Sequence, residues 1–186
     1  MSFGFPRILK DIHQEIRSAL HRGKIVFAAA SNDGANSARA FLASQDGVIC
    51  IHSTDGYGNK SRFNPTAETS PTENFSVVGE AIEAAWPGLG THDSSGTRRL
   101  SGTSFAVPVA VAIAAFMISL VEQRKPEHEQ WATAPGSPAG VRAIFSRMSE
   151  KRDFPYDYVN PLKWLEKDEN SVEELLLGIQ ARLEGG

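Results

Sequence analysis

An α/β fold, in which helices flank a parallel sheet, is predicted for this sequence from the alternation of two patterns. Residues 6–22 have the spacing of an amphipathic helix, whereas residues 24–30 and 47–52 are short apolar runs of strand length. Buried strands of a parallel sheet are nearly continuous apolar runs, and helices between them supply the crossovers. If residues 1–4 form the end of a preceding strand, the chain opens in the order strand, helix, strand.

The first predicted element is the amphipathic helix over residues 6–22. Pro6 suits a first helical turn, and Gly23 suits the residue that follows the last turn. The apolar residues recur at spacings of three and four, which places them on one helix face: Ile8, Leu9, Ile12, Ile16 and Leu20. We therefore expect this helix to end just before the first apolar run.

Both apolar runs are predicted to be buried strands. The second contains Cys50, which we expect to be a buried structural thiol. It is the single cysteine of the chain, so an intrachain disulfide is excluded. Turn-rich segments over residues 31–36, 55–59 and 64–74 predict surface loops between the elements.

A longer apolar run over residues 105–121 raises the question of a membrane span. It falls short of the span length of about 20 residues, and it contains Pro108 and many alanines. We expect a buried core helix and no membrane partner. The first six residues lack the basic and apolar regions of a signal peptide, so the compartment stays open, with an intracellular location favoured.

The chain is predicted to divide near residue 124 within one domain. Residues 1–124 carry the patterns described above, and residues 125–186 are expected to form a mostly helical C-terminal extension of the same domain. Three prolines within residues 125–140 predict an excursion before a short helix around residues 141–148. Ser171 and Glu174 have capping-box spacing and predict a last helix with an apolar face of Leu175, Leu176, Ile179 and Leu183.

Bulk composition excludes several classes of function. The chain has 186 residues, 41% of them hydrophobic, which suits one soluble domain with a sizeable core. Its formal charge is only -3 and its 19 basic residues do not gather with aromatics, so no nucleic acid partner is expected. The sequence holds no Walker-type loop and no G-x-G-x-x-G run, and its five histidines lack zinc-site spacing. No metal or cofactor is therefore identified, and the oligomeric state stays open.

Residues 102–108, which read G-T-S-F-A-V-P, place Ser104 at the start of the predicted core helix. Backbone N–H groups in the first turn of a helix lack internal partners, and the helix dipole is positive there. An oxygen that becomes negative at this point is stabilised, so the position suits a catalytic nucleophile. An ordinary helix cap made by Thr103 or Ser104 fits the same pattern.

Asn32 follows the end of the first predicted strand. A side-chain amide at the carboxyl edge of a parallel sheet faces the usual ligand crevice, so Asn32 is a candidate donor to an oxyanion. The alternative is a turn residue, because Asn, Asp and Gly cluster in turns for backbone reasons.

These segments resemble the subtilisin-like (S8) serine peptidases over about the first 120 residues. Residues 102–108 match the family signature G-T-S-x-A-x-P, and residues 29–34 are similar to its A-A-G-N-x-G segment, with Ser31 in place of the glycine. Residues 1–4 resemble the family's N-M-S-L-G strand, and residues 48–63 resemble its strand followed by G-A-x-D-x-x-G-x-x-S-x-F. The order and spacing of several segments make the resemblance more specific than one motif.

The resemblance implies a serine endopeptidase that cleaves polypeptide substrates by acyl transfer to Ser104, with Asn32 in the oxyanion hole. It also implies that an extended substrate pairs with the backbone of residues 1–4. The implied walls of the primary specificity pocket are Ser2, Phe3, Gly4, Ala29, Ala30 and Ser31. No redox cofactor is implied, and calcium enters only as an ion that many family members bind.

In the family, the catalytic aspartate and histidine precede the oxyanion asparagine. The 31 residues before Asn32 contain neither a D-x-G after a strand nor an H-G-T-x segment. We therefore expect a subtilisin-like domain that is incomplete at its N-terminus, with an unpaired sheet edge, and a chain that is inactive alone. His92 lies in a G-T-H context but follows Asn32, so it is not expected to be the base. None of the other histidines is assigned a catalytic role: His13, His21, His52 and His128.

Two other functions fit parts of the pattern. One is a non-catalytic peptidase remnant, or pseudoenzyme, that keeps a groove for an extended peptide. The other is an α/β-hydrolase with Gly102-x-Ser104-x-Ala106 as its nucleophile elbow, but residues 97–101 form a poor apolar strand ahead of it. D-x-G and H-G-T-x segments in upstream sequence would favour the peptidase, and their absence would favour the remnant.

Overall fold

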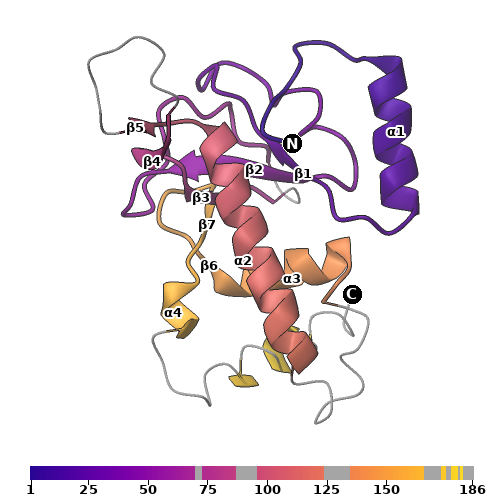
Figure 1. The fold of residues 1–186 in the computed structure, drawn as a ribbon, viewed down its shortest axis with the longest axis vertical. Coiled ribbons are helices and arrows are strands. Elements are labelled where there is room, and N and C mark those ends of the chain that lie inside the picture. Colours follow the sequence, from indigo (N-terminus) through magenta and orange to yellow (C-terminus); the bar gives the residue numbers. More distant parts are fainter. Residues whose placement is uncertain are drawn as a thin grey trace.

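The computed structural model describes residues 1–69, 73–86, 96–123, 135–165, 173–174, 177–179 and 181. Within them, a five-stranded sheet has the order β1-β2-β3-β7-β6 (Figure 1). Its strands are β1 (Phe27–Ala29), β2 (Ile49–Thr54), β3 (Phe75–Val78), β6 (Ser149–Glu150) and β7 (Asp157–Val159). Neighbours from β1 to β7 pair in parallel, and only β6 is antiparallel. The predicted α/β fold with a parallel sheet is confirmed.

Four helices of at least four residues and a two-stranded ribbon accompany the sheet within the described residues. The helices are α1 (Lys10–His21), α2 (Thr103–Gln123), α3 (Pro138–Met148) and α4 (Leu162–Leu165), and the ribbon pairs β4 (Ile82–Ala85) with β5 (Thr97–Leu100). The first helix starts four residues later than predicted, and it ends before Gly23 at a φ of +71°, where glycine is favoured. The helix predicted near residues 141–148 is α3, which starts earlier because the Ser137 side chain caps it.

Alternate residues of the central strands face opposite sides of the sheet, as strand geometry requires. One set joins the core cluster beneath α2 and α3 and includes Phe27, Ala29, Ile49 and Ile51. The other set joins Ile16 of α1 and the segment 41–43, and it consists of Ala28, Ala30, Val48 and Cys50. Both faces are therefore covered, which explains why β1 and β2 are buried along their whole length.

Helix α2 crosses the face of β1, β2 and β3 (Figure 1). Its inner residues are buried in the core and include Ala106, Ala110, Ala114 and Met117. Its outer face leaves Val111 40% exposed and Phe116 52% exposed. Among the described helices, α2 alone has the length and apolar composition of a membrane span. One of its faces packs on the sheet as expected for a core helix, whereas the expected burial of the whole helix is not observed.

Residues 1–4 and residues 97–100 differ from the sequence-based expectation. No strand forms at residues 1–4, although the amino group of Met1 donates to the Phe27 carbonyl (2.5 Å) and the Ala29 N–H donates to the Met1 carbonyl (3.0 Å). These two bonds are those of a parallel neighbour of β1. Strand β5 does form at residues 97–100, but it is an exposed ribbon strand, unlike the buried strand of a hydrolase elbow.

The sequence did not predict β7, which pairs with β3 and extends the sheet. In the predicted C-terminal helix, Glu174 and Ile179 are helical and Ile179 is buried in the core, whereas Ser171, Leu175, Leu176 and Leu183 lie outside the described residues. Most of the predicted excursion over residues 125–140 also lies outside them. The division near residue 124 stays a prediction.

Candidate active site

The start of α2 fixes the orientation of the Asn32 side chain. The Thr103 N–H donates to Asn32 Oδ1 at 2.9 Å, and the Thr103 hydroxyl lies 3.1 Å from the same oxygen and 3.3 Å from the Ser31 carbonyl. A backbone N–H needs an acceptor, so the amide oxygen must point at Thr103 and the amide nitrogen must point elsewhere. No described residue accepts from Asn32 Nδ2, so both of its hydrogens are available to a ligand.

Two glycines let the surrounding backbone approach this amide. A Cβ on Gly102 would lie 3.2 Å from Asn32 Nδ2. The Gly102 N–H donates to the carbonyl of Gly79 at the end of β3 (2.9 Å), and a Cβ on Gly79 would meet Ser53 Oγ at 2.6 Å. Because neither residue has a side chain, the end of β3, the start of α2 and Asn32 can lie in contact.

Ser104 lies in the first turn of α2 and is partly buried. The next two N–H groups of this turn, those of Phe105 and Ala106, donate to the Gly102 carbonyl at 3.0 and 3.3 Å. Within the described part of the chain, no acceptor bonds the N–H of Ser104. The site thus offers a hydroxyl, an unbonded backbone N–H and an oriented amide at the positive end of a 21-residue helix.

A cavity of about 570 Å³ opens beside these groups. Its polar end includes Ser31, Asn32, Thr103 and Ser104, and two charged residues, Asp33 and Arg39, also line it. The rest of its lining is apolar or small: Phe3, Gly4, Phe5, Pro6, Ala29, Ala38 and Ala40. The cavity is large enough for an apolar side chain of a bound peptide.

The structure brings together most of the residues predicted for the substrate pocket. Phe3, Gly4, Ala29 and Ser31 line the cavity with Asn32 and Ser104. Ala30 is completely buried, and its carbonyl accepts from the Ala40 N–H at 2.7 Å, so it supports the wall from behind. Ser2 is exposed next to the lining residue Phe3.

Ser31 has a φ of 139°, a conformation that favours glycine. Local bonds partly offset this strain, because its hydroxyl donates to Asp33 Oδ2 at 2.8 Å and accepts from the Asp33 N–H at 3.1 Å. Backbone strain of this kind costs about 1–3 kcal/mol and is common at functional sites. The family segment that residues 29–34 resemble has glycine at this position, which agrees with the observed φ, although the sequence did not predict this conformation.

The described histidines lie away from Ser104. His13 and His21 line a different cavity, on α1, and the His13 ring contacts Gln45. His52 is completely buried in β2, where Nδ1 lies 3.3 Å from the Phe75 carbonyl and burial lowers its pKa to about 3. His92 and His128 lie outside the described residues. Among the described residues, no group of three His, Cys, Asp or Glu side chains could hold a metal ion.

Sequence reasoning missed two contributors to this site. Thr103, next to the nucleophile candidate, orients an amide 71 residues away, and the G-T-S run gives no sign of that contact. Arg39 lines the cavity although sequence reasoning assigned no role to it. An oriented amide and a serine hydroxyl that line the same cavity are groups that acyl transfer uses.

Comparison with known proteins gives the family. The profile of the subtilase family (peptidase S8) matches residues 1–155, so this chain belongs to that family. Thermitase from Thermoactinomyces vulgaris is 32% identical over 111 residues, which cover 58% of this chain and 35% of Thermitase. Subtilisin BL from Lederbergia lenta is 30% identical over 129 residues, which cover 68% of this chain and 42% of that protein. This chain therefore spans less than half the length of these relatives.

Solved structures share the fold. The self-cleaved protease domain of PatA has a TM-score of 0.62 and 25% identity, with 80% of this chain and 50% of that chain covered. The patellamide maturation protease PatA has a TM-score of 0.66 and 22% identity, with 99% and 60% covered. The PatG macrocyclase in complex with peptide has a TM-score of 0.61 and 19% identity, with 93% and 50% covered. The subtilisin-like fold is thus confirmed.

Proposed function

We propose that this chain supplies the nucleophile and the oxyanion hole of a serine endopeptidase that cleaves polypeptides. Ser104 is the nucleophile, and Asn32 is the side-chain donor to the oxyanion. The observation that carries the proposal is the pair of bonds from Thr103, which hold Asn32 Oδ1 and leave Nδ2 free beside the start of α2. Membership of the subtilase family supports the same chemistry.

In the proposed reaction, Ser104 Oγ attacks the scissile carbonyl carbon and passes its proton to a base. The carbonyl oxygen becomes negative and accepts hydrogen bonds from Asn32 Nδ2 and the Ser104 N–H. Collapse of this intermediate breaks the C–N bond, and the base returns the proton to the leaving amine. In the second half of the reaction, water attacks the ester carbonyl carbon and gives a proton to the base. Collapse of the second intermediate breaks the bond to Ser104 Oγ, and the base returns the proton to this oxygen.

The base is the part that the described residues do not supply. The family order places a catalytic aspartate and histidine in segments that precede the oxyanion asparagine. We propose that the polypeptide carrying them packs on the exposed apolar stripe of α2 around Val111 and Phe116. A stripe of this kind on a core helix marks an interaction surface, and 40–50% of the chain of these solved relatives lies outside the part that this chain covers.

The substrate is proposed to bind along residues 2–4, which are exposed. One substrate side chain would enter the cavity of about 570 Å³, which has an apolar lining from Phe3 and Phe5. The scissile carbonyl would then lie at the polar end of the cavity, next to Ser104 and Asn32.

A chimera tests this function. The segment of Thermitase that precedes its matched region is joined to residue 1 of this chain, and hydrolysis of a fluorogenic peptide is followed. We expect turnover that is abolished by Ser104→Ala and reduced about 10²–10³-fold by Asn32→Ala, as is typical when one oxyanion donor is removed. Thr103→Val keeps the backbone donor and removes the hydroxyl, so it should cost less than Asn32→Ala.

The chimera also distinguishes the alternative function. A pseudoenzyme with a peptide-binding groove would bind an extended peptide but show no turnover in the chimera. A soluble, folded chimera with the same background rate as its Ser104→Ala variant would therefore reject the peptidase proposal.

A further inference from the structure

The buried side chain of Arg39 is an unexpected feature beside the candidate substrate cavity. Arg39 lines this cavity, yet only 5% of its side chain is exposed. Burial of a guanidinium is costly unless hydrogen bonds and charge compensate it. The contacts that compensate it join the cavity wall to a distant part of the chain.

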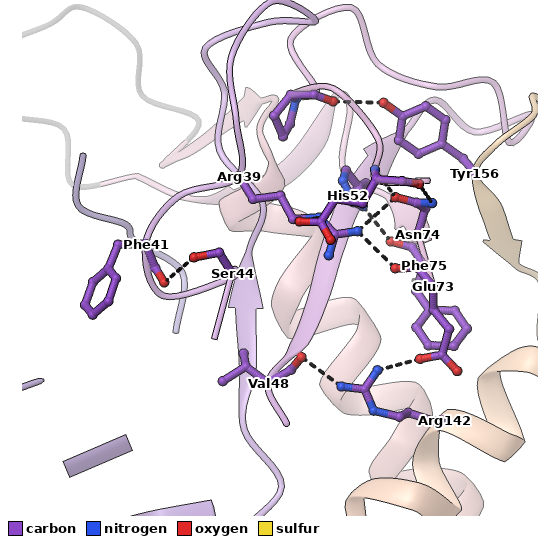
Figure 2. A network of polar contacts seen from close by, with 12 residues as sticks. Arg39, Phe41, Ser44, Val48, His52, Glu73, Asn74, Phe75, Arg142 and Tyr156 are labelled. Carbon is purple, nitrogen blue, oxygen red and sulfur yellow. Dashed lines mark hydrogen bonds and ion pairs between the residues drawn. The ribbon is translucent and has the colours of Figure 1, made fainter. Parts of the chain in front are cut away.

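Figure 2 shows where the guanidinium is held. Arg39 Nη2 donates to the Glu73 carbonyl at 3.0 Å and to Asn74 Oδ1 at 2.8 Å, just ahead of the core strand β3. Arg39 Nε lies 3.5 Å from Glu68 Oε1, and Glu68 is 45% exposed. Asn74 is itself fixed, because it accepts from the Glu68 N–H (3.0 Å) and donates to the Glu68 carbonyl (2.9 Å).

The other attachments of the wall segment 38–40 are backbone bonds of Ala40, whose carbonyl accepts from the N–H groups of Ala43 and Ser44 at 2.9 and 3.1 Å. The Ala40 N–H donates to the Ala30 carbonyl at 2.7 Å, which fastens the segment to the end of β1. On the cavity side, Gly4 approaches so closely that a Cβ there would lie 2.5 Å from Ala40 Cβ. The width of the cavity therefore depends on where segment 38–40 lies, and Arg39 links that segment to Glu73 and Asn74, which lead into β3.

We propose that Arg39 is a positioning residue for the substrate cavity. Its hydrogen bonds to Glu73 and Asn74 fix the position of segment 38–40, and this position gives the cavity a width that suits a large apolar side chain of a bound peptide. This inference rests on the proposed peptide-binding function of the same cavity. The proposed role of Arg39 is to determine which peptide side chains the cavity accepts. This role is indirect, because the guanidinium contacts other residues of the protein while the backbone around Arg39 forms the cavity wall.

The effect of replacing Arg39 on stability distinguishes the positioning role from a purely structural one. Replacing a buried charged residue by an apolar one of similar volume is often close to neutral for stability when no charge is left buried. In Arg39→Met, the partner Glu68 stays partly in solvent, and Asn74 Oδ1 keeps the Glu68 N–H as donor. Loss of the hydrogen bonds from Arg39 to Glu73 and Asn74 should therefore change the preference between peptides more than it changes the free energy of unfolding.

Arg142 provides a matched control in the same network (Figure 2). Its Nη1 pairs with Glu73 Oε2 at 2.5 Å and its Nη2 donates to the Val48 carbonyl at 2.9 Å. It lies on α3 and lines a second cavity of about 170 Å³, which Arg39 also lines, but it does not line the substrate cavity. Arg142→Met should therefore disturb the network without moving the wall of the substrate cavity.

The test measures binding of two fluorescein-labelled pentapeptides to the 186-residue chain by anisotropy. The peptides are identical except for Phe or Ala at the residue that enters the cavity. We expect the parent to prefer the Phe peptide by about tenfold, since a pocket gains about this much or more from a few buried methylene equivalents. Arg39→Met should lower that ratio to below about threefold, Arg39→Lys should restore part of it, and Arg142→Met should keep it.

Each outcome bears on the proposal. A full preference for Phe in Arg39→Met, with circular dichroism matching the parent, would overturn the role of Arg39 and leave the proposed function intact. An equal loss of preference in Arg142→Met would show a general effect of the network and would also overturn it. Binding of neither peptide by the folded parent would reject this proposal together with the peptide-binding cavity on which it rests.

Discussion

Acid destabilisation through His52 is the sharpest stability prediction. His52 is completely buried in β2, its ring packs against Tyr156 with centroids 5.1 Å apart, and its Nε2 has no hydrogen-bond partner within the described structure. Burial, with repulsion from Arg39 as the smaller cause, lowers its pKa in the folded protein to about 3. The folded state therefore keeps a neutral imidazole at a pH where the unfolded chain is already protonated.

Proton linkage gives the sign and the size of the change in the free energy of unfolding with pH. Below the unfolded pKa of about 6.5, the unfolded state binds one proton more than the folded state, so stability falls as pH falls. Between pH 7 and pH 5 this one group should cost about 2 kcal/mol, at about 1.4 kcal/mol for each pH unit below about 6.5. The figure is insensitive to the folded pKa, because about 3 lies well below pH 5. The loss continues until the pH approaches that value.

The assay compares urea unfolding of the parent and of His52→Phe at pH 7, 6 and 5. Phenylalanine keeps a ring against Tyr156 and removes the titrating group, so the free energy of unfolding should lose about 2 kcal/mol less between pH 7 and 5 than in the parent. The exposed His21 on α1 gives the control variant His21→Gln, which should follow the parent. Parallel pH profiles for the parent and His52→Phe would refute the linkage argument.

Three further changes test the account of the site and of α2. Ser31→Gly should raise the free energy of unfolding by about 1 kcal/mol, since it relieves a φ of 139°, and a clear loss in urea unfolding would contradict the strain. Gly79→Ala should lower it by about 1–3 kcal/mol in the same measurement because its Cβ would meet Ser53 Oγ at 2.6 Å, and an unchanged midpoint would show that the contact relaxes. Phe116→Glu should reduce the binding of the dye ANS to the isolated chain, because it removes an apolar side chain from the exposed stripe of α2. It should also lower turnover of the Thermitase chimera, because the added segment is proposed to pack on this stripe. Unchanged ANS binding and unchanged turnover would exclude the stripe as the interface.

Local patterns predicted the elements whose burial is repeated along the sequence. The helix that contains Ile16 has apolar residues on one face, and the strands around Ala28 and Ile51 are buried on both faces, so period and run length revealed them. Strand β3 and strand β7 have only four and three residues, and β7 is defined by its pairing with β3, far away in sequence. Such pairing leaves no periodic signal in so short a run.

The candidate site was predictable only as far as its residue types and their order. Ser104 and Asn32 could be proposed from a helix start and a strand end, and the resemblance to a family strengthened both. The contact from Thr103 that orients the amide depends on how the sheet brings the two segments together. The burial of Arg39 likewise depends on Asn74, which only the folded chain places beside it.

If Ser104 is the nucleophile that forms the acyl-enzyme, a covalent probe for serine nucleophiles should react with it. The chimera with the Thermitase segment is treated with a fluorophosphonate probe, digested and mapped by mass spectrometry. We expect a single adduct on the peptide that contains Ser104; this adduct should be lost in Ser104→Ala and should form much more slowly in Asn32→Ala. An adduct on another residue of this chain, or equal labelling of the Ser104→Ala variant, would contradict this role of Ser104.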